Sequence, residues 1–408
     1  MADKRELLIL GGGLVGMTLA LAAARKGFAS HVVDRADPAE LTAPGFDGRA
    51  SAISTASWNL FTHIGLAERL DPLGCPIASI AVTDAMRPGR IDFAPAQDES
   101  GTADSLGRMF ANRTLRQALF EAARDEPLIA WHQRAEVVAR ERGQHGVAVT
   151  LADGTRLEAA LMVAAEGRGS PTREEAGIAV ARWDYRHRAV TAGLIHSRPH
   201  GNVAWEIFYP AGPFALLPLR DDDQGRHRSA LVWTVAERDA DGMLALSDRA
   251  FAAEAETRMD GLLGTVTVDG PRGSWPLGFH HTATITAQRL ALVGDAGHGI
   301  HPIAGQGFNL GLRDVGALVE VLADGRRIGL DPGDAQLLAR YERWRGLDTF
   351  TVALATDALT RLFGIPGRLP SAARRIGMAA VQRTPALKRW FMDEARGVSG
   401  DLPELLRG

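Results

Sequence analysis

A glycine-rich turn near the N-terminus constrains the fold of this chain more than any other feature. The sequence "RELLILGGGLVGMTLALAAARKGFASHVVD" has the pattern of a short apolar strand, a tight turn, a helix and a second strand. Gly11, Gly13 and Gly16 have the spacing G-x-G-x-x-G, and Asp34 ends the second strand. This combination predicts a Rossmann-like domain that binds a dinucleotide. The motif alone does not distinguish NAD(P) from FAD.

Each residue of this motif has a separate physical task. Gly11 permits the turn, Gly13 lets the backbone approach a pyrophosphate, and Gly16 lets the helix and the strand pack closely. The N-terminus of the helix offers free N–H groups and a partial positive charge to the pyrophosphate. Asp34 can accept hydrogen bonds from ribose hydroxyls. The alternative is a glycine-rich turn that only packs tightly.

A second loop also lies between a predicted strand and a predicted helix. The sequence "GDAGHGIHPIAGQGFNLGLRD" (294–314) follows the apolar run Arg289–Val293. The residues after it have the i, i+3, i+4, i+7 spacing of one helix face: Val315, Leu318, Val319 and Leu322. Loops at this position in α/β folds tend to bind ligands, so we expect the same of this one.

The region between the two loops is rich in predicted strands. Asp153-Gly154 separates two apolar runs and predicts a β-hairpin. From about residue 183 to residue 285 the pattern indicates antiparallel sheet, and from residue 331 onward it is mostly helical. We therefore predict an α/β fold in which a discontinuous Rossmann-like domain carries an inserted antiparallel sheet and is followed by C-terminal helices.

Composition excludes several classes of protein. The 408 residues carry a net charge of −3 with a pI near 6.5, so global charge does not indicate nucleic-acid binding. Cys75 is the single cysteine, which excludes an intrachain disulfide framework and a multi-cysteine metal site. The uncharged stretch Leu7–Ala24 imitates a signal peptide, but its four glycines disfavour a continuous apolar helix. We expect a cytoplasmic protein, since no other stretch has the length of a membrane span.

The second loop also carries a family resemblance. "HPIAGQGFNLGLRD" (301–314) resembles the signature of the ubiquinone-biosynthesis hydroxylases, which are class A flavoprotein monooxygenases of the para-hydroxybenzoate hydroxylase fold. The resemblance continues in "FYPAGPFALLPL" (208–219), "YERWRGLD" (341–348) and "ATDALTRLFG" (355–364). It implies an FAD-binding domain of residues 1–75, 105–182 and 284–345, a substrate domain of residues 76–104 and 183–283, and a C-terminal helical region of residues 346–408.

The resemblance implies that the second loop binds the flavin end of FAD. Gly294 and Asp295 would form the second FAD motif, with the Asp295 carboxylate on the ribityl chain. The helix that follows would present its positive end to the negative charge of reduced flavin. The residues implied to lie against the isoalloxazine ring are His301, Pro302, Gly305, Gln306 and Gly307. Further implied FAD positions are Asn309, Arg49, Asn112 and Arg113.

A third motif of the family has Asp-Gly followed by Ser and Arg. This chain has Glu166-Gly167, Ser170 and Arg173 at those positions. The family associates this loop with both FAD and NAD(P)H, and the extra methylene of Glu166 is expected to change its contacts. A solvated turn acid is the alternative interpretation of Glu166.

Other interpretations of these residues stay open. His298 and His301 could form a metal pair, but no matching ligand cluster is evident, and we expect no metal site. Asp295 could cap a helix. His301 is more simply structural than a proton-transfer group.

Arginines and aromatic residues have similar alternatives. Without the family, Arg49 and Arg113 are more simply surface charges than cofactor ligands. Trp205, Phe208 and Phe214 are expected in the sheet core, with a place in the substrate wall as the alternative.

The resemblance implies an FAD-dependent monooxygenase. NAD(P)H, with NADPH as the expected donor, reduces the flavin, O2 yields a C4a-hydroperoxide, and a hydroxyl group passes to a polyprenylated phenol of ubiquinone biosynthesis. The flavin carries this chemistry, so no protein nucleophile is required, and the sequence identifies no base for the phenol. The alternatives are a flavin monooxygenase acting on a soluble aromatic compound, a non-catalytic flavin-binding accessory protein, and an NAD-linked dehydrogenase.

The C-terminal segment suggests where a lipophilic substrate could be met. Residues 361–396 contain eight basic and two acidic residues, with aromatic side chains among them. A basic helical segment of this kind can lie on an anionic membrane surface. The alternative is a helix packed on the protein with a solvated basic face. We expect peripheral contact with the inner face of the membrane and with a ubiquinone-biosynthesis complex.

Overall fold

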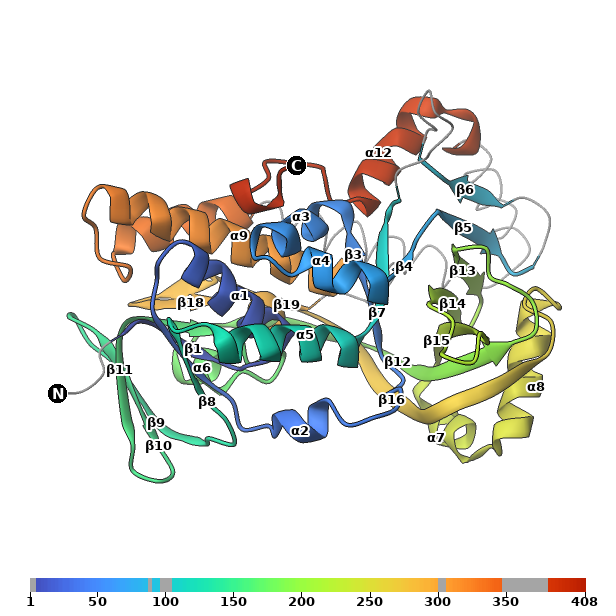
Figure 1. Ribbon diagram of the computed structural model, residues 1–408, viewed down its shortest axis with the longest axis horizontal. Helices are drawn as coiled ribbons and strands as arrows, with labels where there is room; N and C mark the ends of the chain where they lie inside the picture. Colours follow the sequence, from blue (N-terminus) through green and yellow to red (C-terminus); the bar gives the residue numbers. More distant parts are fainter. Residues whose placement is uncertain (1–4, 87–89, 96–104, 300–305, 347–380) are drawn as a thin grey trace.

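The strands of this protein form three sheets. The computed structural model describes residues 5–86, 90–95, 105–299, 306–346 and 381–408. Within these residues there are two sheets of eight strands and one of three. Figure 1 shows the sheet that contains the N-terminal strand on one side of the molecule, the second large sheet on the other side, and the small sheet between them.

The first sheet is built around the N-terminal strand β1 (Arg5–Leu10), which pairs in parallel with a strand on each side. The order along its main path is β17–β18–β11–β1–β2–β8, and β10 and β9 continue outward from β11. These strands are β2 (Ser30–Val33), β8 (Ile129–His132), β9 (Val137–Arg142), β10 (Val147–Leu151), β11 (Arg156–Ala164), β17 (Thr286–Ala287) and β18 (Leu290–Leu292). Parallel strands buried on both faces explain the apolar runs in the sequence.

Three helices lie beside this sheet: α1 (Leu14–Arg25), α5 (Asn112–Asp125) and α9 (Gln306–Arg327), with α1 in contact with both of the others (Figure 1). The α1 helix ends at Arg25, with Lys26 as its C-cap. Gly27 has φ +80°, and its N–H donates to the carbonyl oxygen of Ala24, while the N–H of Phe28 donates to that of Ala23. These bonds satisfy carbonyl groups that the helix end leaves without partners.

The second sheet has the order β19–β16–β12–β15–β14–β13–β5–β6. Two strands of 17 residues, β12 and β16, run side by side along it. The bounds are β5 (Ser79–Asp84), β6 (Ile91–Phe93), β12 (Val180–His196), β13 (Val203–Tyr209), β14 (Gly212–Leu219), β15 (His227–Ala236), β16 (Val266–Thr282) and β19 (His298–Gly299).

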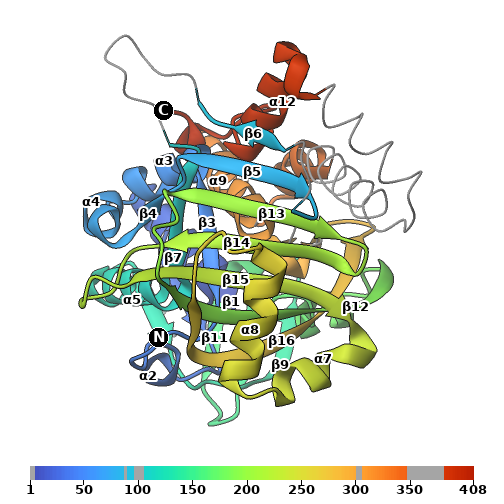
Figure 2. The same ribbon diagram turned by 90° about the vertical axis from the view of Figure 1, so that its right-hand side faces the viewer.

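Both faces of the second sheet are covered. The helices α7 (Glu237–Ala245) and α8 (Asp248–Met259) lie over the outer face, on the side away from the first sheet (Figures 1 and 2). The opposite face, which we call the inner face, packs partly against the small sheet of β3 (Ala50–Ser54), β7 (Gly107–Ala111) and β4 (Cys75–Pro76). The second sheet is therefore a middle layer.

The remaining short elements connect these layers. They are α2 (Pro38–Leu41), α3 (Thr55–His63), α4 (Ala67–Leu70), η1 (Asp71–Leu73), α6 (Pro171–Glu175), η2 (Gly294–Ala296), α12 (Pro385–Ala395) and η4 (Glu404–Leu406). Residues 335–346 are also helical. Most of the basic C-terminal segment predicted from the sequence lies outside the described residues, although α12 belongs to it.

The predicted α/β class and the inserted sheet are confirmed. The hairpin at Asp153-Gly154 joins β10 to β11, and Val315, Leu318, Val319 and Leu322 are buried on α9. The inserted sheet is antiparallel, as predicted, except that β13 pairs in parallel with β5. This exception arises because β5 comes from a distant segment, so no hairpin fixes its direction. The domain boundaries stay predictions.

Candidate functional site

The first glycine loop lies in a tightly packed corner between β1 and α1. Gly11 has φ +101°, a conformation that favours glycine, and a Cβ there would overlap the carbonyl oxygen of Ala165 at the end of β11. A Cβ at Gly16 would overlap the carbonyl oxygen of Gly11. Gly13 differs, because a Cβ there would meet nothing within 4 Å. The loop is therefore closed toward the protein and open at Gly13.

Asp34 organises the end of this loop. Its carboxylate accepts hydrogen bonds from the backbone N–H of Gly12 at 2.5 Å and of Ala36 at 2.7 Å. A carboxylate has about four acceptor positions, so these two bonds leave room for hydroxyl donors. The helix α1 has no side-chain cap at Gly13, and among the described residues no side chain accepts a hydrogen bond from its first N–H groups.

The second glycine loop packs directly against the first. A Cβ at Gly294 would lie 3.2 Å from a methyl group of Val15, and a Cβ at Gly311 would lie 3.0 Å from the same methyl group. The first turn of α1 is therefore held between the Gly294 loop and α9. Two motifs from opposite ends of the sequence meet here and can act on one ligand.

Asp295 faces solvent at this junction. Its side chain is 46% exposed, and its nearest ion-pair partner, Arg168, lies at 3.4 Å. Asp295 is inside the short helix η2, whose N-cap is Val293, so the helix-cap alternative is not supported. An exposed carboxylate beside two glycine loops can accept hydrogen bonds from a ligand.

A buried ion cluster holds the second loop from beneath. The Asp314 carboxylate on α9 is fully buried and accepts hydrogen bonds from the Gly294 N–H at 2.8 Å and the Arg345 Nε at 2.7 Å. The Nε2 atom of His298 lies 2.5 Å from it. Burial alone would raise the pKa of Asp314, but His298 and Arg345 outweigh it and the pKa is lowered.

Sequence reasoning missed the role of Asp314. His298, one of the two histidines of the metal-pair alternative, contacts this carboxylate, whereas the other, His301, lies outside the described residues. The sequence did contain a signal for this role, because Asp314 occupies a position of α9 that faces the core. Charged residues are rarely buried unless they are paired.

The second loop is also fastened to the edge of the second sheet. Gly299 of β19 pairs with His280 of β16, and the Nε2 of His280 lies 2.8 Å from the carbonyl oxygen of Asp295. Burial lowers the pKa of His280 to about 4, so the ring is neutral near pH 7 and donates this hydrogen bond. The same loop therefore contacts both large sheets.

The third motif forms a closed network around Glu166. Its carboxylate accepts hydrogen bonds from the Ser170 hydroxyl at 2.6 Å and the Thr172 N–H at 3.2 Å, and it pairs with Arg140 at 3.2 Å. Its side chain is 13% exposed, so the solvated-acid interpretation is wrong. The fully buried Arg173 extends the network by donating to the Ala296 carbonyl oxygen at 3.0 Å.

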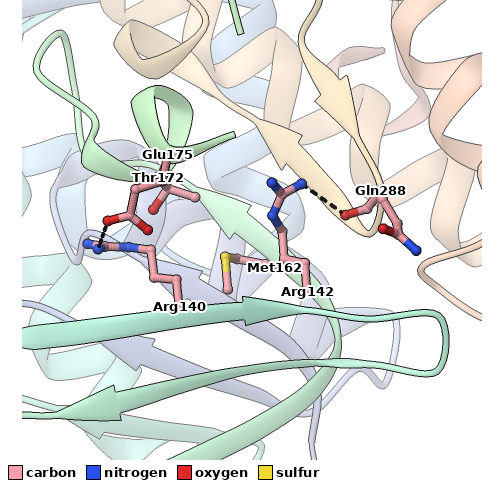
Figure 3. A pocket seen from close by; sticks show the side chains of 6 residues that line it. All are labelled: Arg140, Arg142, Met162, Thr172, Glu175 and Gln288. Atoms are coloured by element: carbon pink, nitrogen blue, oxygen red, sulfur yellow. Dashed lines mark hydrogen bonds and ion pairs between the residues drawn. The ribbon is translucent and has the colours of Figure 1, made fainter. Parts of the chain in front are cut away.

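A small polar cavity lies beside this network (Figure 3). Arg140 pairs with Glu175 at 2.7 Å on one side of it, and Arg142 donates to the Gln288 carbonyl oxygen at 3.2 Å on the other. Its volume is about 150 Å³. Sites for drug-sized ligands usually measure about 300–1,000 Å³, so this cavity is too small for a prenylated aromatic compound.

The remaining predicted residues lie at several places. Arg49 stacks on Trp275 at 5.0 Å, and its carbonyl oxygen accepts from the Asn112 N–H. Arg113 donates to the Thr42 carbonyl oxygen at 2.9 Å. The bonds of both arginines are to the protein, and their roles as FAD ligands stay predictions.

The last group of predicted residues lies at and before the start of α9, and only those on the helix are described. Gln306 and Gly307 begin the helix, and a Cβ at Gly307 would meet nothing within 4 Å. The side-chain amide of Asn309 donates to the Ala52 carbonyl oxygen and accepts from the Ser54 N–H, so it also joins α9 to β3. Three predicted residues lie outside the described residues: His301, Pro302 and Gly305.

Trp205 and Phe214 belong to the apolar cluster beneath α8, which confirms their expected place in the core. Phe208 alternates with them and lies on the inner face. The aromatic residues therefore divide between the two faces of the sheet.

The residues of the two glycine loops fit a bound dinucleotide. The uncapped end of α1, the open positions at Gly13 and Gly307, and the exposed Asp295 carboxylate lie on elements that pack together, because α9 contacts both α1 and η2. Helix N-termini and glycine backbones bind pyrophosphate, and a carboxylate binds sugar or ribityl hydroxyls. This donor set suits FAD.

Comparison with known proteins decides the family. A sequence model described as FAD binding domain matches residues 4–347. The ubiquinone hydroxylase UbiL of Rhodospirillum rubrum is 43% identical over 411 residues, covering 100% of this chain and 94% of that protein. The chain belongs to the FAD-dependent monooxygenase family of the ubiquinone hydroxylases. The 3-demethoxyubiquinol 3-hydroxylase of Escherichia coli is 33% identical over 396 residues, covering 96% of this chain and 98% of that enzyme.

A solved structure supports the fold. The p-nitrophenol 4-monooxygenase PnpA of Pseudomonas putida superposes with a TM-score of 0.77 at 17% identity, over 97% of this chain and 98% of that one. The family, the fold and FAD as cofactor are thus confirmed. Monooxygenases of this kind use NAD(P)H as co-substrate, whereas the choice of NADPH stays a prediction.

Proposed function

We propose that this protein hydroxylates an electron-rich phenol with a polyprenyl tail during ubiquinone biosynthesis. The observation that carries the proposal is the packing of Gly294 and Gly311, in the second loop, against Val15 of the first motif, because it brings the two FAD motifs together. The two relatives at 43% and 33% identity are named for hydroxylation of ubiquinone or its precursor.

The two loops would hold FAD from opposite ends. The N-terminus of α1 and Gly13 would bind the pyrophosphate, and Asp34 would bind the ribose. Asp295 would bind the ribityl chain, and the positive end of α9 near Gly307 would stabilise negative charge on the ring. Bound FAD supplies the redox chemistry that activates O2 for transfer of one oxygen atom.

The network of the third motif would keep this arrangement rigid. Arg173 connects the Glu166 loop to Ala296, and Asp314 fixes Gly294. Because Glu166 is held by three groups, this loop gives no support to a non-catalytic accessory role. NAD(P)H would dock transiently, since the described residues contain no second dinucleotide fold.

The activity can be tested with the purified protein. We expect a yellow protein that oxidises NADPH when a short-chain prenylated phenol is added. Under ¹⁸O2, mass spectrometry should find one ¹⁸O atom in the product. A folded protein that stays colourless and takes up no FAD would contradict the proposal, and equal activity on an unprenylated phenol would favour the soluble-substrate alternative. Deleting the gene should cause a hydroxylation-deficient quinone precursor to accumulate.

We also propose peripheral membrane contact through α12. Trp390 is 48% exposed, and the basic residues Lys388 and Arg389 lie next to it. The adjacent Phe391 instead faces β6, with its ring 6.0 Å from that of Phe93. An exposed tryptophan among basic residues suits an anionic lipid surface. No helix among the described residues is both long and apolar enough to cross a bilayer.

Vesicle flotation tests this contact. Wild-type protein should float with vesicles that contain anionic lipid, and Trp390→Ala should reduce the bound fraction severalfold. Trp183→Ala is the control, because Trp183 is 37% exposed on a different part of the protein. Equal flotation of both variants, or none by the wild type, would contradict the proposal. Contact with a ubiquinone-biosynthesis complex stays a prediction.

A further inference from the structure

Glu206 of β13 places a buried carboxyl group on the inner face of the second sheet. Along β13 side chains alternate between the two faces. Trp205 and Ile207 point to the outer face, where they pack with Phe251 of α8. Ala204 points to the inner face and packs with Met109 of β7. Glu206 has the same parity as Ala204, so its carboxyl group lies on the inner face.

The residues next to Glu206 on the neighbouring strands are apolar. In register with it lie Val82 of β5 and Ala215 of β14, and Phe208 follows on the same face of β13. Glu206 is 9% exposed. Within the described residues its carboxyl group has no hydrogen-bond or ion-pair partner. This contrasts with Asp84, a buried carboxyl opposite Phe208 that does have a partner.

The raised pKa of Glu206 is caused by burial and not by a neighbouring charge. Burial alone raises the pKa of Glu206 to about 8. The charged or titratable side chains on the inner face, within the described residues, include Asp84 on β5, Arg228 on β15, His187 and Tyr185 on β12, and Asp269 and His281 on β16. The elements packed against this face add Cys75 on β4, Arg49 before β3, and Lys388, Arg389, Asp393 and Glu394 on α12.

An unpaired buried carboxyl group destabilises the fold, and an apolar side chain would avoid that. Such groups concentrate at functional sites. A free phenol has a pKa of about 10, so a carboxylate with a pKa near 8 accepts its proton far more readily than an ordinary glutamate with a pKa of about 4.3. The inner face is also the face turned toward the FAD loops (Figures 1 and 2).

We propose that Glu206 is the base that accepts the phenolic proton of the substrate during hydroxylation. This inference rests on the proposed function. The O–H bond of the phenol breaks, the proton moves to a carboxylate oxygen of Glu206, and the electron pair stays on the phenolate oxygen. The ring carbons ortho and para to that oxygen become more nucleophilic, which suits them to the electrophilic oxygen that bound FAD would supply. The proton returns to solvent after product release.

The test compares Glu206→Gln with wild-type holoenzyme. The glutamine keeps the size of the side chain and removes its basicity. We expect flavin content and NADPH-dependent flavin reduction to be retained, while product formed per NADPH falls by about 100-fold and hydrogen peroxide is released instead. Wild-type hydroxylation should rise with pH toward about 8, because the active form is deprotonated, and this rise should be absent from the variant.

The control is Asp84→Asn, which removes a buried carboxyl from the same face. It should keep the pH dependence of the wild type. If wild-type protein hydroxylates the phenol but Glu206→Gln retains its product yield and its pH profile, Glu206 is not the base. If the wild type itself makes no product from any phenol, the proposed function fails instead.

A second measurement covers the case in which Glu206→Gln does not fold. The ultraviolet absorbance of the phenol bound to wild-type protein reports its ionisation. Bound phenol should become phenolate at a lower pH than free phenol, and Glu206→Asp should move that pH. Ionisation of bound phenol at the pH of free phenol would overturn the inference.

Discussion

Two carboxyl groups buried in different halves of this protein have opposite surroundings. Asp314, beneath the second FAD loop, is fully buried and contacts Arg345, His298 and the Gly294 N–H. Glu206, on the inner face of the second sheet, is almost as buried and has no partner among the described residues. The pKa of Asp314 is lowered, although burial opposes this, and the pKa of Glu206 is raised to about 8.

The difference indicates two uses of a buried acid. A carboxylate surrounded by donors orients the groups that bind it, and here it fixes the loop that carries Asp295. A carboxyl without donors is a group held ready for a proton or a ligand. The protein's own hydrogen bonds therefore fix the loop that binds FAD. On the inner face of the second sheet, where the described residues give Glu206 no hydrogen-bond partner, a ligand can supply one.

The largest effect is expected from Asp314→Ala. The change leaves Arg345 as a buried charge without its carboxylate and frees the Gly294 loop. Breaking one partner of a buried pair typically destabilises by about 3–5 kcal/mol. We expect a loss of that order in the free energy of unfolding by urea, together with loss of bound FAD.

Asp324→Ala is the matched control, because Asp324 lies on the same helix. Its side chain is 28% exposed and pairs with Arg327 and Arg340 near the surface. Exposed pairs contribute about 0–1 kcal/mol, so this variant should differ little from wild type. Similar losses in both variants would mean that the Asp314 cluster does not organise the loop.

The contrast between these acids also separates what the sequence predicts from what it does not. The glycine spacing around Gly11 and the periodicity of α9 predicted the fold and both FAD loops, because local pattern determines strand, turn and helix. Asp314 and Glu206 were not identified, since their roles depend on partners that only the tertiary structure brings together or withholds. Glu166 was predicted as a departure from the family, but its three contacts required the folded loop.

The second largest effect concerns Glu206 and the pH dependence of stability. Its raised pKa means that native protein holds a proton that unfolded protein has lost between about pH 4.5 and 8, so the free energy of unfolding falls as pH rises across that window. The slope is about 1.4 kcal/mol per pH unit. The free energy of unfolding of Glu206→Gln, measured in urea and taken relative to that of wild type, should therefore increase by about 3 kcal/mol between about pH 5 and pH 7.

Asp314 should give the opposite sign. Because its pKa is lowered, its contribution to stability is present near neutral pH and is lost as the pH falls through its unfolded pKa toward the folded value. The deficit of Asp314→Ala should shrink under acid conditions. If the free energy of unfolding changed with pH in the same way for wild type and Glu206→Gln, the predicted difference between Glu206 and Asp314 would be wrong.

A third and smaller effect tests whether the flavin half is complete without FAD. Gly16→Ala places a methyl group against the Gly11 carbonyl oxygen, and overpacking of this kind costs about 1–3 kcal/mol. Gly13→Ala meets no protein atom within 4 Å, and φ −70° there suits alanine. Differential scanning calorimetry of flavin-free protein should detect only the first change, and FAD titration should detect both. Unchanged FAD affinity in Gly13→Ala would place the pyrophosphate elsewhere.

The smallest effect on stability is expected from Asp295→Asn, the exposed counterpart of Asp314. Its contact with Arg168 is 3.4 Å long and both side chains are at least 40% exposed, so unfolding should change by less than about 1 kcal/mol. FAD affinity should nevertheless fall by about 10-fold to 100-fold, since hydrogen bonds to a charged group contribute about 1.5–3 kcal/mol. Arg168→Ala removes the same ion pair but leaves the carboxylate, and should keep most of the affinity in a fluorescence titration. Equal weakening by both variants would assign the effect to the ion pair, and the exposed acid would then be structural like Asp314.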